Sequence, residues 1–139
     1  MNILVDTNII IDWLLAREKN GKNAEKAMRY IMSKNAEGFV TPHSLADLYF
    51  CVRKEFSKSD RQRLLKFIIS KMNIISEERD DFEEVLSIEK LDDLEDGLQM
   101  QCAKKMNLDY ILTENIKDFA GSEVQPILTA DFLRLVDAE

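Results

Sequence analysis

The chain has 139 residues and a formal net charge of −7, with 45% hydrophobic and 32% charged residues. This length suits one domain, residues 1–139, and this composition is ordinary for a soluble globular protein. The longest apolar run near the start, residues 9–15, is interrupted by Asp12, and no basic segment precedes it. We therefore expect no signal peptide and no membrane contact, and we expect a cytoplasmic protein.

The cysteines and the single histidine exclude two classes of catalytic site. Cys51 and Cys102 lack the spacing of a zinc site, and each falls among apolar residues of a predicted helix. We expect both to be buried free thiols. A Ser-His-Asp or Cys-His nucleophile would have to use His43, and no other feature of the sequence supports such a scheme.

Short strands alternate with helices along the chain. Apolar runs predict strands at residues 2–5, 38–41, 73–76, 109–113 and 123–127. Helical periodicity predicts helices at residues 7–17, 23–34, from 42 onward, 57–70, 79–89 and 92–106, a helical turn at 116–119, and a last helix from 129. Pro126 places the last strand at an edge. This alternation predicts an α/β domain with a mainly parallel sheet.

Local signals add detail to these helices. The predicted N-caps are Thr7, Thr41, Ser57 and Thr129. The predicted inner face of the helix at 92–106 consists of Leu94, Leu98, Cys102 and Met106. Gly97 is expected to open the acidic face of that helix, because it has no side chain.

Aspartates recur just beyond the predicted strands or on the helices that follow them. Asp6 follows a buried strand, where an unpaired carboxylate is costly unless it binds a metal. Asp47 lies on the polar face of its helix, Asp93 and Asp96 share one face of a later helix, and Asp118 follows the fourth strand. Taken singly, each also fits a turn, a cap or a solvated surface.

The positions of these acids become informative together. In a parallel sheet, residues beyond the carboxyl ends of the strands can converge on a single edge. Gathered carboxylates repel one another, and a divalent ion relieves that repulsion. Oxygen ligands without His or Cys select Mg²⁺ or Mn²⁺ over zinc. We expect such a site, with Asn115 supporting a metal-bound water.

The charges are unevenly distributed. Residues 53–71 contain seven Lys or Arg and two acids, whereas residues 77–96 contain eleven Asp or Glu, one Arg and one Lys. This sorting suits a basic flank beside an acidic pocket, although solvated helix faces explain each run about as well. We expect Arg53, Lys54 and Arg61 to contact nucleic-acid phosphates.

Four motifs resemble those of the PIN domain family, which includes the VapC-like toxin nucleases. They are Ile-Leu-Val-Asp6-Thr-Asn8, Ser44-Leu-Ala-Asp47-Leu-Tyr, Asp93-Leu-Glu-Asp96-Gly-Leu-Gln and Ile111-Leu-Thr113-Glu-Asn115-Ile-Lys-Asp118-Phe. The resemblance covers almost the whole chain. It implies a three-layer α/β/α sandwich and a ribonuclease that depends on Mg²⁺ or Mn²⁺ and hydrolyses RNA phosphodiester bonds.

Carried over by position, the resemblance implies a role for each residue. The catalytic acids would be Asp6, Asp47, Asp96 and Asp118. The metal would be held by Asp6, Asp96, Asp93 and Asp118, with polar support from Asn8, Thr113 and Asn115. The chain departs from the family at two positions, since many members have Glu in place of Asp47 and Asp in place of Asn115.

The resemblance also implies partners, namely an RNA substrate, an antitoxin protein if the chain is a toxin, and a second copy in a homodimer. Two alternatives stay open. One is a catalytically weakened PIN-fold module that binds RNA or a regulatory partner protein. The other is a phosphatase of haloacid-dehalogenase type, which normally requires a second Asp where this chain has Asn8.

Overall fold

Within residues 1–137, which the computed structural model describes, five parallel strands form one sheet. The strand order is β3-β2-β1-β4-β5. The strands are β1 (Asn2–Val5), β2 (Glu37–Val40), β3 (Asn73–Ile74), β4 (Tyr110–Leu112) and β5 (Gln125–Ile127). In register, Ile3 lies between Gly38 of β2 and Tyr110 of β4. The predicted parallel sheet is confirmed, and so is the edge position of Pro126 in β5.

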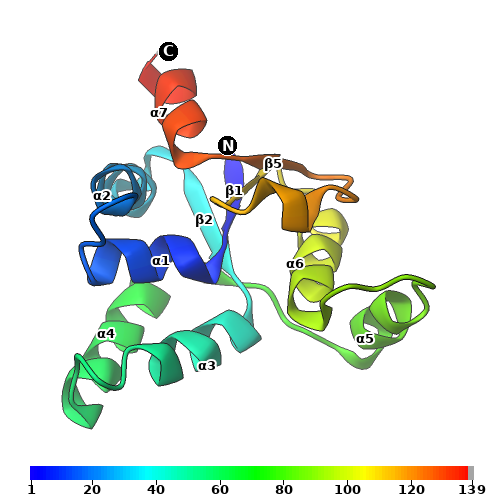
Figure 1. Cartoon of the computed structure of the whole chain (residues 1–139), viewed down its shortest axis with the longest axis horizontal. Helices are drawn as coiled ribbons and strands as arrows, with labels where there is room; N and C mark the ends of the chain where they lie inside the picture. Colours follow the sequence, from blue (N-terminus) through cyan, green and yellow to red (C-terminus); the bar gives the residue numbers. More distant parts are fainter. Residues whose placement is uncertain (138–139) are drawn as a thin grey trace.

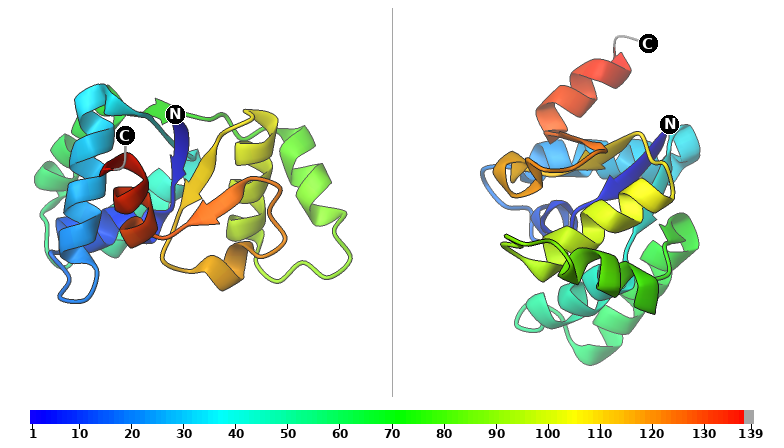
Figure 2. Two further views of the ribbon diagram at one scale, coloured as in Figure 1. Left: turned by 90° about the horizontal axis from the view of Figure 1, so that it is seen from above. Right: turned by 90° about the vertical axis from the view of Figure 1, so that its right-hand side faces the viewer.

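The helices cover both faces of this sheet (Figures 1 and 2). They are α1 (Thr7–Leu14), α2 (Gly21–Tyr30), α3 (Pro42–Cys51), α4 (Lys58–Lys71), α5 (Arg79–Leu86), α6 (Leu94–Lys105) and α7 (Thr129–Asp137). A π-helical turn (Ile31–Asn35) follows α2, and the 3-10 turn η2 (Ile116–Phe119) follows β4. In the described part of the chain, no helix combines the length and apolar character needed to cross a membrane.

The alternating side chains of β1 divide the core into two clusters. Ile3 and Val5 belong to a cluster that includes buried residues of α1, α2 and α7. Leu4 belongs to the other cluster, with Cys102 of α6 and Phe119 of η2. Helix α5 packs against α6, on the side away from the sheet (Figure 1). The expected three-layer sandwich is therefore confirmed.

Two of the four predicted N-caps are wrong. The N-cap of α1 is Asp6, whose backbone is extended, and Thr7 is the first helical residue. Helix α1 ends at Leu14 rather than near residue 17, because Ala16 turns the chain with a φ of 47°. Thr129 is the first residue of α7, and its hydroxyl binds Glu114 instead.

The caps of α3 and α4 are confirmed. The Thr41 hydroxyl accepts from the Ser44 backbone N–H at 3.3 Å, and the Ser57 hydroxyl accepts from that of Asp60 at 3.1 Å. Pro42 occupies the first turn of α3, as expected.

Helix α6 differs from its prediction at both ends. It begins at Leu94, and Asp93 is its N-cap rather than a helical residue. Leu94 and Met106 are 39% and 46% exposed, so the predicted inner face is wrong at these positions. The buried stripe covers only the middle of the helix and consists of Gly97, Leu98, Gln99, Cys102 and Ala103.

Gly97 permits close packing rather than opening a face, which corrects its predicted role. A Cβ at this position would lie 2.6 Å from Val85 Cγ1 and 3.1 Å from Leu91 Cδ1. We expect Gly97→Ala to lower the free energy of unfolding by about 1–3 kcal/mol, as overpacking does. Helix propensity alone would favour alanine by about 1 kcal/mol. A net loss of stability would therefore show that the close contact with Val85 and Leu91 outweighs this gain.

Urea unfolding of Gly97→Ala measures this loss. Gly121→Ala is the matched control, because a Cβ there would meet nothing within 4 Å. Equal stability of the two variants would show that α5 and α6 can separate without cost.

The two cysteines differ, which corrects half of their prediction. Cys102 is buried as expected, and burial raises the pKa of its thiol to about 12, whereas Cys51 is exposed. We expect a disulfide reagent such as DTNB to modify Cys51 alone in the native protein, because the thiolate is the reacting form. The Cys51→Ser variant should then react only after unfolding, and rapid native reaction of that variant would contradict the burial of Cys102.

Candidate active site

Asp6 lies at the carboxyl end of β1 and is 5% exposed. Its Oδ2 accepts from Thr113 Oγ1 at 2.8 Å, and its Oδ1 accepts from Gln99 Nε2 at 3.2 Å. Burial raises the pKa of Asp6, while these two hydrogen bonds act in the opposite direction and the charge of Asp118 adds to the increase. The sheet therefore fixes one carboxylate in a position where its ionised form is costly.

Asp96 lies in the first turn of α6, beside the cap. Its backbone N–H donates to Asp93 Oδ1 at 2.9 Å. Burial raises the pKa of Asp96 to about 6, and the charges that add to this increase come from Asp93, Asp6, Asp118 and Glu95. The structure thus brings together four of the predicted acids closely enough for their charges to repel.

The loop after β4 supplies the other predicted polar residues. Thr113 binds Asp6 and also accepts from the Asn115 backbone N–H at 2.9 Å. The Asn115 carbonyl in turn accepts from the Asp118 N–H at 3.0 Å. The Asn115 and Asp118 side chains are exposed, as is that of Asn8 on α1. Thr113 therefore connects the buried acid to the loop that carries Asp118.

Asp47 takes a different partner. Its carboxyl lies beside that of Glu95, the residue before Asp96. Burial raises the pKa of Glu95, the contact with Asp47 raises it further, and the charge of His43 lowers it. The structure thus joins Asp47 to the cluster through Glu95.

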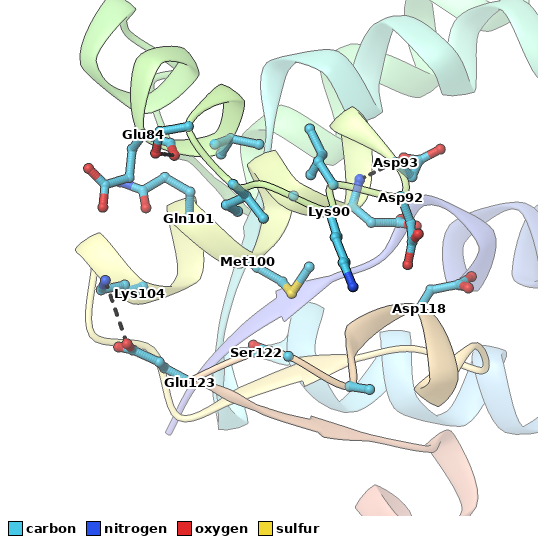
Figure 3. Close-up of a pocket in the computed structure, with 18 of the residues that line it drawn as sticks. Glu84, Lys90, Asp92, Asp93, Met100, Gln101, Lys104, Asp118, Ser122 and Glu123 are labelled. Atoms are coloured by element: carbon cyan, nitrogen blue, oxygen red, sulfur yellow. Dashed lines mark hydrogen bonds and ion pairs between the residues drawn. The ribbon is translucent and has the colours of Figure 1, made fainter.

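A pocket of about 490 Å³ opens beside the acids, between α5, α6 and the turn η2 (Figure 3). Asp93, Asp96 and Asp118 line it, and Asp93 and Asp118 lie at the same end of the pocket in Figure 3. Its lysines are Lys90, Lys104 and Lys117. Lys104 pairs with Glu123 at 3.6 Å. The pocket thus combines carboxylates with cations that can contact phosphate.

The predicted phosphate contacts divide into two kinds. Arg53 and Lys54 are exposed, and the Arg53 guanidinium lies 3.7 Å from the centre of the Phe50 ring. Arg61 is only 8% exposed. Its guanidinium lies over the Tyr49 ring and donates to the Tyr49 carbonyl at 3.0 Å. The prediction for Arg61 is therefore wrong, because its charged group is already occupied within the fold.

The donor chemistry of the acidic cluster suits a hard divalent cation. Within residues 1–137, no three His, Cys, Asp or Glu side chains form a ready-made metal cluster. Asp6, Asp93, Asp96 and Asp118 offer only oxygen donors, and repulsion from the other three adds to the increase that burial causes in the pKa of Asp96. A cation among them would relieve this repulsion, and oxygen donors favour Mg²⁺ or Mn²⁺.

Sequence reasoning missed Gln99, which holds Asp6 from α6. It lies one turn beyond Asp96, and it is a polar residue on an otherwise apolar inner face, a signal that could have found it. It also missed Glu95, which lies beside Asp47. The contact between Glu95 and Asp47 joins residues 48 positions apart, so no local sequence pattern predicts it.

Comparisons with known proteins identify relatives of this chain. The chain is 26% identical over 137 residues to ribonuclease VapC1 of Aquifex aeolicus (strain VF5), covering 94% of this chain and 92% of that protein. A toxin-antitoxin complex from Klebsiella pneumoniae contains a chain of similar fold, with a TM-score of 0.70 and 23% identity, covering 91% of this chain and 97% of that one.

A second solved structure is VapC20 of Mycobacterium tuberculosis, described as a toxin that cleaves the sarcin-ricin loop. It has a TM-score of 0.67 and 13% identity, covering 86% of this chain and 95% of that one. The family model described as the PIN domain matches residues 2–117. The fold, the acids at the carboxyl edge of the sheet and this match together show that the chain belongs to the PIN domain family.

Proposed function

We propose that this protein is a metal-dependent endoribonuclease that hydrolyses phosphodiester bonds in RNA. The observation that best supports this proposal is the acidic cluster, in which the charges of Asp93, Asp6 and Asp118 add to the effect of burial in raising the pKa of Asp96. Similarity to a protein named as a ribonuclease supports the reaction. Family membership removes the haloacid-dehalogenase alternative.

Each acid has a proposed part in the site. Asp6 and Asp96 hold Mg²⁺ or Mn²⁺, with Asp93 and Asp118 as further ligands or as partners of its waters. When bound, the ion lowers the pKa of a water molecule and stabilises charge on the phosphate. Thr113 and Gln99 keep the Asp6 carboxylate in a single orientation.

The cations of the chain have a separate proposed part. Lys90 and Lys117 line the pocket beside the acids, and Arg53 and Lys54 are exposed near the end of α3. These side chains contact the RNA backbone, which gives affinity without sequence readout. Charge-based contacts of this kind weaken as salt concentration rises.

We propose two protein partners. The similar chain in the Klebsiella pneumoniae complex comes from a toxin-antitoxin assembly, which supports an antitoxin that inhibits this chain. We also propose a homodimer, as the family resemblance implies. Co-expression with the product of a neighbouring gene, followed by size-exclusion chromatography with light scattering, tests both partners.

A second function is favoured by one observation. Asp47 lies beside Glu95, so its carboxyl would be less free to act on a metal ion or a water molecule, and the site would have lost part of its catalytic power. The chain would then be a PIN-fold module that binds RNA or a protein without cutting RNA.

A cleavage assay separates the two functions. The protein is incubated with end-labelled structured RNAs in Mg²⁺, Mn²⁺ or EDTA, and Asp6→Asn purified in the same way controls for contaminating nucleases. We expect metal-dependent internal cuts that Asp6→Asn does not make. RNA binding without cuts in either metal would favour the binding module.

A further inference from the structure

The pocket beside the acids extends well beyond them. Its volume of about 490 Å³ lies within the range of about 300–1,000 Å³ that is usual for small-molecule sites. Asp93 and Asp118 lie at one end of it (Figure 3). The ion pair of Lys104 with Glu123 lies at the other end. The acids that we propose to hold the metal therefore occupy only part of this space.

The middle of the pocket is apolar. Val85 belongs to α5, Ile88 and Leu91 follow that helix, and Met100 belongs to α6. Figure 3 shows the Met100 side chain between the two ends of the pocket. Ile88 is 49% exposed, and Met100 is half-buried. A ligand that covered these side chains would gain free energy by removing apolar surface from water.

A nucleobase is a ligand group that matches this lining. Its faces are flat and aromatic, and a methionine thioether makes favourable contacts with aromatic rings. Its edge carries N–H groups, which need acceptors. The Ser122 hydroxyl lines the pocket and donates to the Val124 carbonyl at 2.6 Å, so its oxygen can still accept. The pocket thus offers contacts to both the face and the edge of a base.

The charges around the pocket favour a base that belongs to an RNA strand. Lys90 and Lys117 line the pocket and are exposed, and the Lys90 side chain extends between Met100 and Asp118 in Figure 3. In RNA a single ribose joins each base to its phosphates. A base that packed on Met100 would therefore place phosphates near these lysines and near the acids, and lysines position nucleic acids through their phosphates.

We propose that the apolar middle of this pocket, formed by Val85, Ile88, Leu91 and Met100, binds one unpaired nucleobase of the RNA substrate beside the phosphate that is cut. Its part in cleavage rests on the ribonuclease function proposed above, whereas the binding of a base can be measured without cleavage. Such a site restricts cleavage to single-stranded or looped RNA, because only an unpaired base can leave its stack and enter a pocket.

Nuclear magnetic resonance of the methionine methyl groups tests the contact with the base. The ring current of a base that packs on Met100 shifts its methyl signal, which a sugar phosphate cannot do. The chain has six methionines, and the signal that disappears in Met100→Gln is that of Met100. We expect AMP, GMP, CMP or UMP in Mg²⁺ to shift this signal, and ribose 5-phosphate to leave it in place. Met72, which is 5% exposed and belongs to the other core cluster, should not respond.

Nucleosides separate the binding of a base from the acidic cluster, because they carry no phosphate and need no metal. We expect adenosine or cytidine to shift the Met100 signal in EDTA, at higher concentrations than the mononucleotides. A Met100 signal that no mononucleotide and neither nucleoside moves would overturn the proposal. That result is the one expected if a protein segment fills the pocket instead.

Two exposed apolar residues provide matched variants. Ile88 lines the pocket, whereas Leu86, two residues earlier, does not. They are 49% and 62% exposed, so neither change should disturb the fold. We expect Ile88→Asn to raise the Kd of the best-bound mononucleotide about 5-fold, the scale of losing one apolar contact, and Leu86→Asn to leave it unchanged. Equal Kd values in the two variants would overturn the placement of the base.

The cleavage assay keeps the two possible failures apart. If the wild type cuts no RNA but mononucleotides shift the Met100 signal, the proposed function fails and the base site stands. If the wild type cuts RNA while the Met100 signal stays in place, the base site fails and the proposed function stands.

Discussion

We expect Asp6→Asn to lower the rate of metal-dependent RNA cleavage at least about 100-fold, which is the scale of losing one electrostatic contact to a transition state. Asn keeps the shape of Asp but loses the charge, and Asp6 is one of the two main ligands proposed for the metal. We expect kcat/KM to fall with every RNA substrate. The same loss is expected in Mg²⁺ and in Mn²⁺.

The fold should tolerate this change. Gln99 Oε1 is buried and makes no hydrogen bond with the described residues, so its amide can turn over and accept from the new Asn amide. Thr113 can still donate to the Asn oxygen. Because burial raises the pKa of Asp6, the ionised group is costly at neutral pH and its removal should not lower the free energy of unfolding.

The matched control for this variant is Asp109→Asn. Asp109 is exposed and binds the Asn2 backbone N–H at the amino ends of β1 and β4, opposite the acidic cluster. Asp109→Asn should retain wild-type kcat/KM. Full activity in Asp6→Asn, or an equal loss in Asp109→Asn, would contradict the assignment of Asp6.

The second large effect is a loss of stability as pH rises in the absence of metal. Asp96 has a pKa of about 6 in the folded protein and a reference value of 3.8. Between these values the folded state holds the proton more tightly than the unfolded chain, so the free energy of unfolding falls as pH rises through this interval. The stability present below about pH 4 is lost once Asp96 ionises above pH 6.

A shift of about two pKa units corresponds to about 3 kcal/mol for a fully buried group. Asp96 is partly exposed, and solvent screening reduces this to about 1 kcal/mol, or about 3 °C in Tm. Asp6 contributes in the same direction. Asp81 contributes in the opposite direction, because Lys105 holds its pKa down against the effect of burial.

Thermal unfolding in EDTA from pH 4.5 to 7.5 measures this effect in the wild type and in Asp96→Asn. The contribution of Asp81 is the same in both proteins, so it cancels when their curves are compared. We expect the wild type to lose more stability than the variant across this range. Mn²⁺ should raise Tm at pH 7.5 in the wild type more than in Asp96→Asn. Parallel pH curves would show that Asp96 ionises normally in the folded state.

Local signals predicted much of the fold. Apolar runs located the strands, and β1 leads directly to Asp6. Thr41 and Pro42 begin α3 as their types predict, since a cap depends only on residues within one turn. Thr7 failed as a cap because α1 begins one residue earlier than predicted, with Asp6 as its N-cap. Thr129 failed because its hydroxyl binds Glu114, which is distant in the sequence.

The contacts between residues far apart in the chain could not be predicted from the sequence. Gly97 faces Val85 across two helices, and Arg61 stacks on Tyr49 twelve residues earlier. The pairing of Asp47 with Glu95 depends on how α3 and α6 approach, which no spacing encodes. The sequence predicted which acids lie together, whereas it did not predict the side chain that each acid contacts.

Anomalous diffraction from crystals grown with Mn²⁺ at pH 7.5 tests the acidic site most directly. We predict a peak between the carboxylates of Asp6 and Asp96, and its loss in Asp96→Asn crystals. A preparation that cleaves RNA in Mn²⁺ but shows no peak at these carboxylates would contradict the account.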